Sequence, residues 1–233
     1  MSSVIIPAMV TATGPKFQTL PNEILLMIFK YVFVISDSLN EHVLRVLVLH
    51  GRFPKWLAMS KNISGLVREA FFTNNLFKFT DKHYIYRSES WGSDELPLLP
   101  QPQFRHLFRR IQIKIILVDY YWADAPDYDK ATKTGDKHIL TPITNVDQLY
   151  QYCAGARKLR DLTHATTGFG RLDVLDLTIE PHFDFYDDVT FATYKAAGLS
   201  VRAGQVNIEI VPQSTRDPCY MWADRLKDTI AVD

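Results

Sequence analysis

The sequence predicts an α/β protein of the mixed type, with a small, mainly parallel sheet that carries helices on one face. Three five-residue segments alternate apolar and polar side chains, as half-buried strands do. These segments are Ile111–Ile115, Leu175–Ile179 and Val206–Ile210. Stretches with helical spacing, at about 145–163 and 189–197, separate the three strands. The order strand, helix, strand, helix, strand implies parallel pairing through right-handed crossovers.

The alternation within these strands also selects one kind of parallel sheet. A sheet with helices on both faces has strands that are apolar nearly throughout. Here every second residue is polar or charged, so one face is expected to meet solvent or a ligand. We therefore expect a leucine-rich-repeat-like layer, but an irregular one, because the strands are unequally spaced along the chain.

The first strong element is a helix from Pro21 to about Phe33. Pro21 suits a first helical position, and Glu23 falls in the first turn, where the helix dipole favours an acid. Apolar side chains cover nearly its whole surface. One face contains Ile24, Met27, Ile28, Tyr31 and Val32, and the rest of the surface contains Leu25, Leu26, Phe29 and Phe33. Such a helix must be covered on more than one side, either by its own domain or by a partner.

Further elements are expected on both sides of the strands. An amphipathic helix is predicted from about Pro54 to Phe72, with a stop at Asn74 and Asn75. A longer helix over 145–163 has one apolar face and a cap from Thr144 with Asp147, or from Asn145 with Gln148. The remaining predictions are strands at Glu41–Leu49 and Leu76–Phe79, an extended loop at Asp81–Pro102 and an acidic, aromatic loop at Asp119–Asp129.

Composition excludes several classes of protein. The 233 residues include 26 Lys and Arg against 26 Asp and Glu, so no net charge attracts nucleic acid or anionic lipid. The longest apolar run, Ile24–Ile35, is interrupted by Lys30 and is shorter than a membrane span. The two cysteines, Cys153 and Cys219, fit a reduced compartment. We expect an intracellular protein, cytoplasmic or nuclear, that binds neither nucleic acid nor membrane.

Patterns for catalysis or cofactor binding mostly fail on geometry. Gly168-Phe169-Gly170 starts like a dinucleotide loop, but a strand follows where a helix is needed to receive the pyrophosphate. Acids and one histidine crowd the segment 180–188, yet no histidine follows His182 to complete an iron triad. A basic cluster at Arg105–Lys114 is expected to be a solvated strand entry. The sequence therefore predicts neither an enzyme, nor a cofactor, nor a metal site.

Two blocks of sequence resemble a known family. The segment Leu20–Tyr31, LPNEILLMIFKY, resembles the opening of an F-box, whose usual order is Leu-Pro-x-Glu-Ile, three residues, then Ile-Phe-x-Tyr. The second block resembles F-box-like proteins of filamentous fungi. It comprises Leu57–Ser64, Glu69–Phe72, Asn74–Phe79 and Arg109–Ile113. The resemblance covers about residues 17 to 117, although Val34–Phe53 lengthens the usual short connection to the second helix.

The resemblance implies an adaptor that binds a Skp-type linker of a cullin ubiquitin ligase and presents a target protein. The docking contacts carried over by position are Leu20, Pro21, Ile24, Ile28 and Phe29. Candidate target contacts are the polar residues of the open sheet face, Gln112, Lys114, Asp176, Thr178, Asn207 and Glu209. The alternative is a self-contained interaction or structural protein in which the first helix belongs to the core and engages no ligase.

The expected organisation along the chain follows from these elements. Residues 1–17 form a flexible N-terminus, 18–80 an F-box-like helical region, and 81–104 a loop. Residues 105–233 form the α/β recognition region, which we expect to pack as one unit with 18–80.

Overall fold

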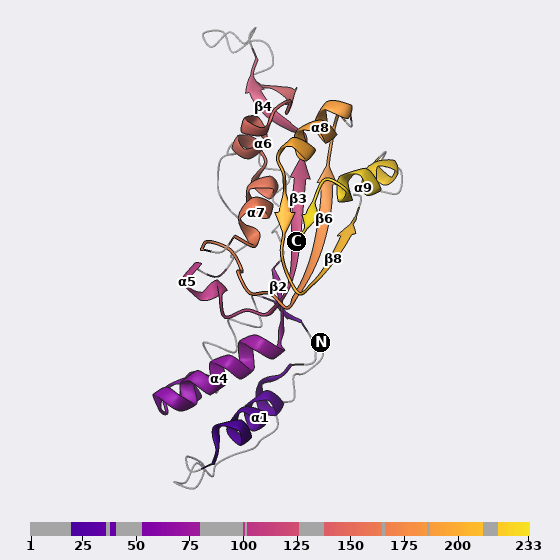
Figure 1. Ribbon diagram of the computed structural model, residues 1–233. Coiled ribbons are helices and arrows are strands. Elements are labelled where there is room, and N and C mark those ends of the chain that lie inside the picture. Colours follow the sequence, from indigo (N-terminus) through magenta and orange to yellow (C-terminus); the bar gives the residue numbers. More distant parts are fainter. Residues whose placement is uncertain are drawn as a thin grey trace, which may run out of the picture.

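The computed structural model describes residues 20–35, 38–40, 53–79, 100, 102–125, 138–164, 166–185, 187–211 and 219–233. Within this part of the chain, five parallel strands form one sheet in the order β1–β2–β3–β6–β8 (Figure 1). The strands are β1 (Leu39–Asn40), β2 (Leu76–Phe79), β3 (Arg110–Val118), β6 (Val174–His182) and β8 (Gln205–Ile210). The predicted parallel pairing is confirmed, and the alternating segments lie in three adjacent strands.

The strands follow one another across the sheet in chain order, and this order fixes where the helices lie. Each right-handed crossover then returns on the same side of the sheet. The helices α6 (Val146–Tyr152), α7 (Ala154–Leu162) and α8 (Asp188–Ala196) accordingly stack along one side of the sheet (Figure 1). The helix α9 (Cys219–Lys227) lies beside α8, where the Arg225 guanidinium packs on the Phe191 ring.

The core forms between this helical layer and the inward side chains of the strands. Every second residue of β3 and β6 is almost completely buried, at Ile111, Ile113, Ile115, Leu117, Leu175, Leu177 and Ile179. Opposite them lie buried helix residues at Leu149, Cys153, Ala156, Leu159, Leu162 and Tyr194. The intervening residues of β3 are half-buried, apart from the exposed Arg110. The period-two pattern therefore separates a dry face from a polar one, as predicted.

Close packing of α7 on β3 depends on a glycine. A Cβ atom at Gly155 would lie 1.9 Å from the carbonyl oxygen of Ile116. Since no side chain fits in this space, the first turn of α7 rests directly on the strand backbone.

The helix expected over 145–163 is two helices, α6 and α7, which meet at Cys153. Cys153 is extended, and its sulfur accepts a hydrogen bond from the N–H of Ala156, so it ends one helix and caps the next. Arg157 donates to the carbonyl oxygens of Tyr150 and Gln151 at 2.7 and 2.6 Å, which satisfies the end of α6. The predicted Asn145 cap is confirmed by its bond from the N–H of Gln148, at 2.9 Å.

The helix expected from Pro54 to Phe72 is also divided, into α3 (Phe53–Leu57) and α4 (Lys61–Asn74). Ser60 is extended, and its side-chain oxygen accepts a hydrogen bond from the N–H of Ile63 at 3.2 Å. A serine in this position starts a helix, which explains why the amphipathic pattern restarts there.

The acidic, aromatic loop predicted at Asp119–Asp129 is wrong over its first half. Residues Tyr120–Asp124 form β4, which pairs antiparallel with β5 (His138–Pro142). The ring of Tyr121 stacks on that of Tyr152 in α6, with centroids 4.0 Å apart. Aromatic residues favour strands, and here they outweigh the acids that suggested a loop.

Other predictions fall partly or wholly outside the described residues. The flexible N-terminus at 1–17 and the strand at Glu41–Leu49 lie there, as does most of the loop at 81–104. Near the end of that loop a short helix, α5 (Pro102–Arg105), is present. A second small parallel pair joins β7 (Ser200–Val201) to β9 (Ala231–Val232).

The N-terminal helix is present as α1 (Asn22–Phe33), with Pro21 at its N-cap, and it packs against α4. Leu25 and Phe29 are buried, and the Phe29 ring lies 5.5 Å from that of Trp56 in α3. Asn75 joins the ends of the two long helices. Its amide donates to the carbonyl oxygens of Phe33 and Phe71 at 2.8 and 2.7 Å, and accepts from the N–H of Ile35 at 2.7 Å.

Replacing Asn75 with Ala is expected to reduce the free energy of unfolding by about 3 kcal/mol, because one buried and two part-buried backbone groups lose their partner. Urea unfolding followed by circular dichroism measures the change. Asn74→Ala is the matched control, since among the described residues Asn74 donates to the carbonyl oxygen of Ala70 alone, and about 1 kcal/mol or less is expected. Equal losses in the two variants would contradict the role given to Asn75.

Candidate protein-interaction surfaces

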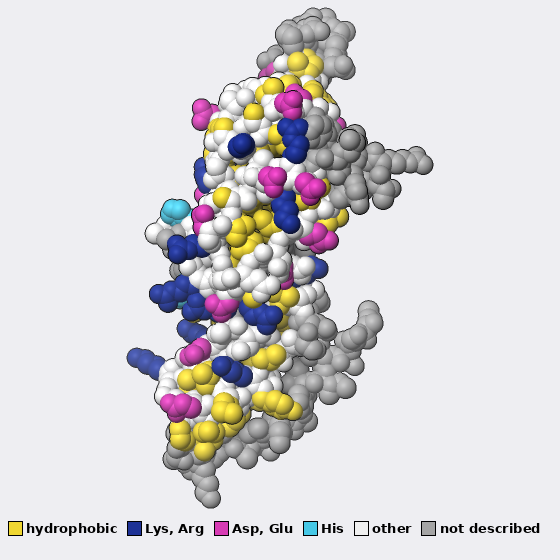
Figure 2. Space-filling view, turned by 45° about the vertical axis from the view of Figure 1, so that its right-hand side comes forward, with side chains coloured by type: hydrophobic (Ala, Val, Ile, Leu, Met, Phe, Trp, Pro, Cys, Tyr) yellow, Lys and Arg dark blue, Asp and Glu magenta, His cyan; other side chains and the backbone are white. Residues whose placement is uncertain are grey.

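The helix α1 leaves a continuous apolar strip at the surface, which we call the α1 face. It comprises Leu20, Ile24, Met27, Tyr31 and Val34, with exposed fractions of 36, 43, 66, 85 and 44%. Ile24, Met27 and Tyr31 recur at three and four residues and so lie along one side of the helix, and Leu20 and Val34 flank its two ends. Figure 2 shows hydrophobic side chains gathered at the lower end of the molecule, where Figure 1 places α1 and α4. This exposed apolar strip is therefore a candidate interaction surface.

The five docking residues expected from the F-box resemblance divide between surface and core. Leu20, Pro21 and Ile24 are exposed, and Ile28 is half-buried. Phe29 is completely buried between α1 and α3, so it supports the helix from inside and does not reach the surface. The most exposed positions, Met27 and Tyr31, were not in the expected set. Helical spacing in the sequence could have identified Met27 and Tyr31, because it places both on the same face as Ile24.

The six expected target contacts lie together on the polar side of the sheet, which we call the open face. Strand register arranges them in two rows across β3, β6 and β8. One row is Gln112, Asp176 and Asn207, and the other is Lys114, Thr178 and Glu209. Asn207 and Glu209 are exposed, and the other four are half-buried. The first row continues through Lys78 and Asn40 to the far edge of the sheet, which sequence patterns did not indicate.

Polar contacts order this face. The Asn207 amide donates to the Asp176 carboxylate at 2.7 Å, and the Gln205 amide donates to Asn207 at 3.3 Å. The Lys114 ammonium forms an ion pair with one oxygen of Glu180, and the His182 ring lies 3.1 Å from the other. The charge of Lys114 is therefore already paired with a residue of the neighbouring strand β6.

Glu180 is the most buried acid of this group, with 10% of its side chain exposed. Burial raises its pKa, but hydrogen bonds from Lys114 and His182 and the nearby positive charge lower it by more. The pKa of Glu180 therefore lies below its ordinary value of 4.5, and the carboxylate is ionised at neutral pH.

At the carboxyl end of the sheet, Asp119 fixes the segment that leads from β6 into α8. Its carboxylate is 1% exposed and accepts hydrogen bonds from the N–H groups of Asp184 and Phe185 at 2.8 and 2.9 Å. The Thr190 hydroxyl donates to the same group at 3.5 Å. Ligands of open α/β sheets usually bind at this end, but here the carboxylate is used to hold a loop.

The acids at 180–188 have separate structural partners. Asp187 caps α8 by accepting from the N–H of Thr190 at 2.7 Å, and Asp188 pairs with Arg225 at 2.8 Å. Among the described residues, no three His, Cys, Asp or Glu side chains form a group that could hold a metal ion.

The basic cluster at 105–114 is likewise engaged with the fold. Arg105 donates to the carbonyl oxygens of Pro100 and Thr167, and Arg109 donates to that of Arg171 at 2.8 Å. Burial lowers the pKa of Arg105, against the effect of nearby Asp161. Figure 2 shows acidic and basic side chains interspersed over this side of the molecule, without a large patch of one sign.

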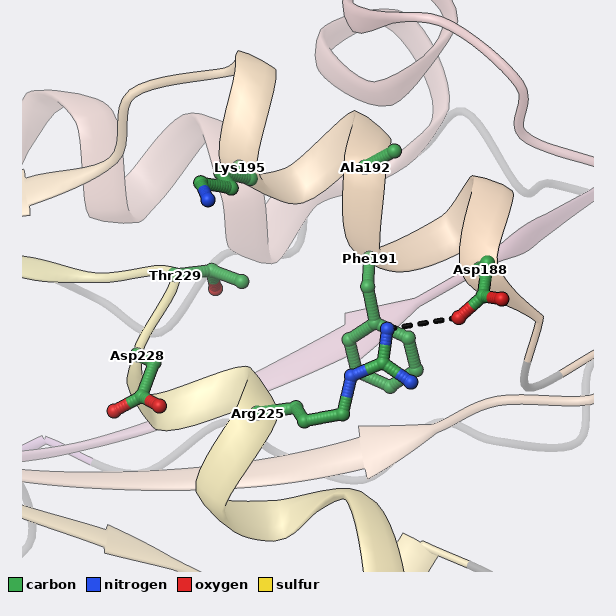
Figure 3. Close-up of a pocket in the computed structure, with 7 residues that line it drawn as sticks. All are labelled: Asp188, Phe191, Ala192, Lys195, Arg225, Asp228 and Thr229. Carbon is green, nitrogen blue, oxygen red and sulfur yellow. Dashed lines mark hydrogen bonds and ion pairs between the residues drawn. The ribbon is translucent and has the colours of Figure 1, made fainter.

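A shallow pocket of about 370 Å³ lies between α8 and α9 (Figure 3). Its charged residues are Asp188, Lys195, Arg225 and Asp228, two acids and two bases. The Arg225 guanidinium lies over the Phe191 ring at 4.6 Å and points toward Asp188. These two contacts of Arg225 hold α9 against α8. The charge of Arg225 is therefore already paired within the fold.

In comparisons with known proteins, the chain matches no family model, no curated protein and no solved structure. In the part of the chain that the structure describes, no helix has the length and apolar character needed to cross a membrane.

Glu180 gives a prediction for the dependence of stability on pH. Because folding lowers its pKa, the stabilisation is present above pH 4.5 and is lost as the pH falls through the folded pKa. Glu180→Gln is expected to be less stable than the natural protein near pH 6, with a difference that shrinks as the pH falls below 4.5. Urea unfolding at a series of pH values measures it. Glu209→Gln, an exposed acid on the neighbouring strand, is the control, and a constant difference for Glu180→Gln would contradict the assignment.

Proposed function

We propose that this protein is an F-box-like adaptor, which binds a Skp-type linker of a cullin ubiquitin ligase through the α1 face and a target protein through its α/β region. The observation that carries the proposal is the exposure of apolar side chains on α1 within the segment that resembles an F-box opening. Leu20, Ile24 and the flanking Met27 and Tyr31 form a strip available to a partner.

The support of α1 from behind favours a docking role. Leu25 and Phe29 anchor the helix to α3 and α4, and Asn75 fixes its end. An interface on a helix held in this way loses little conformational freedom when a partner binds. The α1 face is therefore preorganised in the free protein.

The α/β region supplies a second surface of different chemistry. The five parallel strands of the described sheet follow in chain order, as in an irregular leucine-rich-repeat-like layer with one polar face. Its two polar rows present amide and charged groups at the strand spacing of about 4.8 Å. A polar surface on a rigid sheet suits selective recognition of a target, whereas the apolar α1 face suits a more constant linker.

The alternative is a self-contained interaction or structural protein that engages no ligase. It is favoured by the complete burial of Phe29 and Leu25, which makes α1 part of the core on one side. This alternative does not explain why the other side of α1 exposes apolar side chains.

Ile24→Glu tests the adaptor proposal directly. Ile24 is 43% exposed, so a carboxylate at this position stays solvated in the free protein. In an apolar interface the same carboxylate loses its water and gains no group of opposite charge. Co-purification and titration with a recombinant Skp-type protein are expected to show binding to the natural chain and a loss of at least about a hundredfold in the variant.

The matched control is Val189→Glu on α8, where the replaced apolar side chain is similarly exposed at 47%. It is expected to bind the linker as the natural chain does. No binding by the natural chain, or equal binding by the Ile24 and Val189 variants, would exclude the α1 face as a linker site.

A further inference from the structure

The strand β8 is the last strand of the sheet, and none of the described strands pairs with its outer edge. The N–H of Gln205 donates to the carbonyl oxygen of Asp173, and that of Val211 donates to the carbonyl oxygen of Ile179, each at 2.8 Å. These two N–H groups therefore point inward, toward β6. In a parallel ladder successive residues point their N–H and C=O groups to opposite sides. The outward groups of β8 therefore belong to Val206, Ile208 and Ile210. Among the described residues no strand pairs with this edge, and Figure 1 shows β8 as the outermost arrow of the sheet.

Among the described residues, β8 has few of the features that normally protect an edge strand. Proteins blunt an exposed edge with Lys, Pro or a bulge, because its unpaired backbone groups bind other strands. The sequence of β8, QVNIEI, has neither Lys nor Pro, and its register with β6 is continuous from Gln205 to Ile210. Its apolar residues are β-branched and half-buried, which favours strand addition.

The surroundings of β8 indicate which kind of strand fits. On the open face, Glu209 and the neighbouring Asp176 are acidic, and neither β6 nor β8 contains Lys or Arg. The ammonium of Lys114, from the next strand along, is already paired with Glu180. On the other face of the strand, Val206, Ile208 and Ile210 present apolar side chains. A complementary strand therefore alternates apolar side chains with basic ones.

We propose that the β8 edge binds an extended segment of the target protein as a sixth strand, with apolar residues alternating with Lys or Arg. The inference rests on the adaptor function and refines it, because it moves target recognition from the open face to its edge. A second copy of this chain fits less well. Its own β8 strand, QVNIEI, contains no Lys or Arg that could face Glu209.

A synthetic peptide with blocked ends, in which Val alternates with Lys over seven residues, is the probe. Fluorescence anisotropy measures its binding to the full chain. Ile208→Pro removes an outward N–H without touching the ladder to β6, a position where edge strands tolerate Pro. Binding is expected to weaken about tenfold. Ile208→Ala loses the same side chain but keeps the N–H, and its binding is expected to stay within about threefold of the natural chain.

The charge preference has its own variant. Glu209→Lys is expected to weaken binding of the Val–Lys peptide and to permit binding of a peptide in which Val alternates with Glu. Circular dichroism and urea unfolding of each variant separate a loss of binding from a loss of fold.

Several results would overturn the proposal. One is no binding of the peptide to the natural chain at millimolar concentration, and another is equal weakening by Ile208→Pro and Ile208→Ala. A dimer in sedimentation that Ile208→Pro abolishes would assign the edge to a second copy instead. Ile24→Glu is expected to keep peptide binding and Ile208→Pro to keep linker binding, so failure of the edge site and failure of the adaptor function are distinguishable.

Discussion

The handedness of the crossovers is the constraint on which the rest of this structure depends. A chain that adds each parallel strand on the same side of the last one, with right-handed connections, must place its crossover helices on one face. The dry face then takes the apolar residues of each strand, and the polar residues between them line up in rows. The same topology leaves β8 with one neighbour, since the chain does not return beyond it within the described residues.

Two buried polar side chains, Asn75 and Asp119, fix segments outside the sheet: the end of α1 and the loop before α8. Asn75 lies between α4 and β2 and binds backbone groups at the C-terminal end of α1. It therefore fixes α1 to the junction of α4 and β2. Asp119 follows β3 and binds the loop that starts α8. In both places a side chain satisfies backbone groups that have left their helix or strand, which the interior of a protein requires.

Sequence patterns predicted the elements whose signal is local. The strand Ile111–Ile115 was recognisable because alternate burial repeats within five residues. The division at Cys153 was not, because Leu149, Cys153 and Ala156 remain on one buried face whether or not the helix is continuous. The hairpin of β4 and β5 was missed because its two strands are separated by residues that carry no pairing signal of their own.

The candidate sites show the same division between local and distant information. A helix that is apolar nearly all round does not reveal which side its own domain covers. The position of α3 and α4 decides this, and it assigns Phe29 to the core and Met27 and Tyr31 to the surface. The open-face residues were predictable because strand alternation alone separates Asp176 from Leu175. The edge of β8 was not, since the order of strands in a sheet is set by packing across the whole chain.

The two surfaces are linked through the backbone as well as through packing. The helix α1 packs against α4, Asn75 binds the ends of both helices, and α4 passes into β2 with only Asn75 between them. From β2 the ladder continues through β3 and β6 to β8, so the position of the edge is fixed relative to the α1 face. The proposed adaptor function needs this property, because the effective concentration of the target falls when the connection between its two sites is loose.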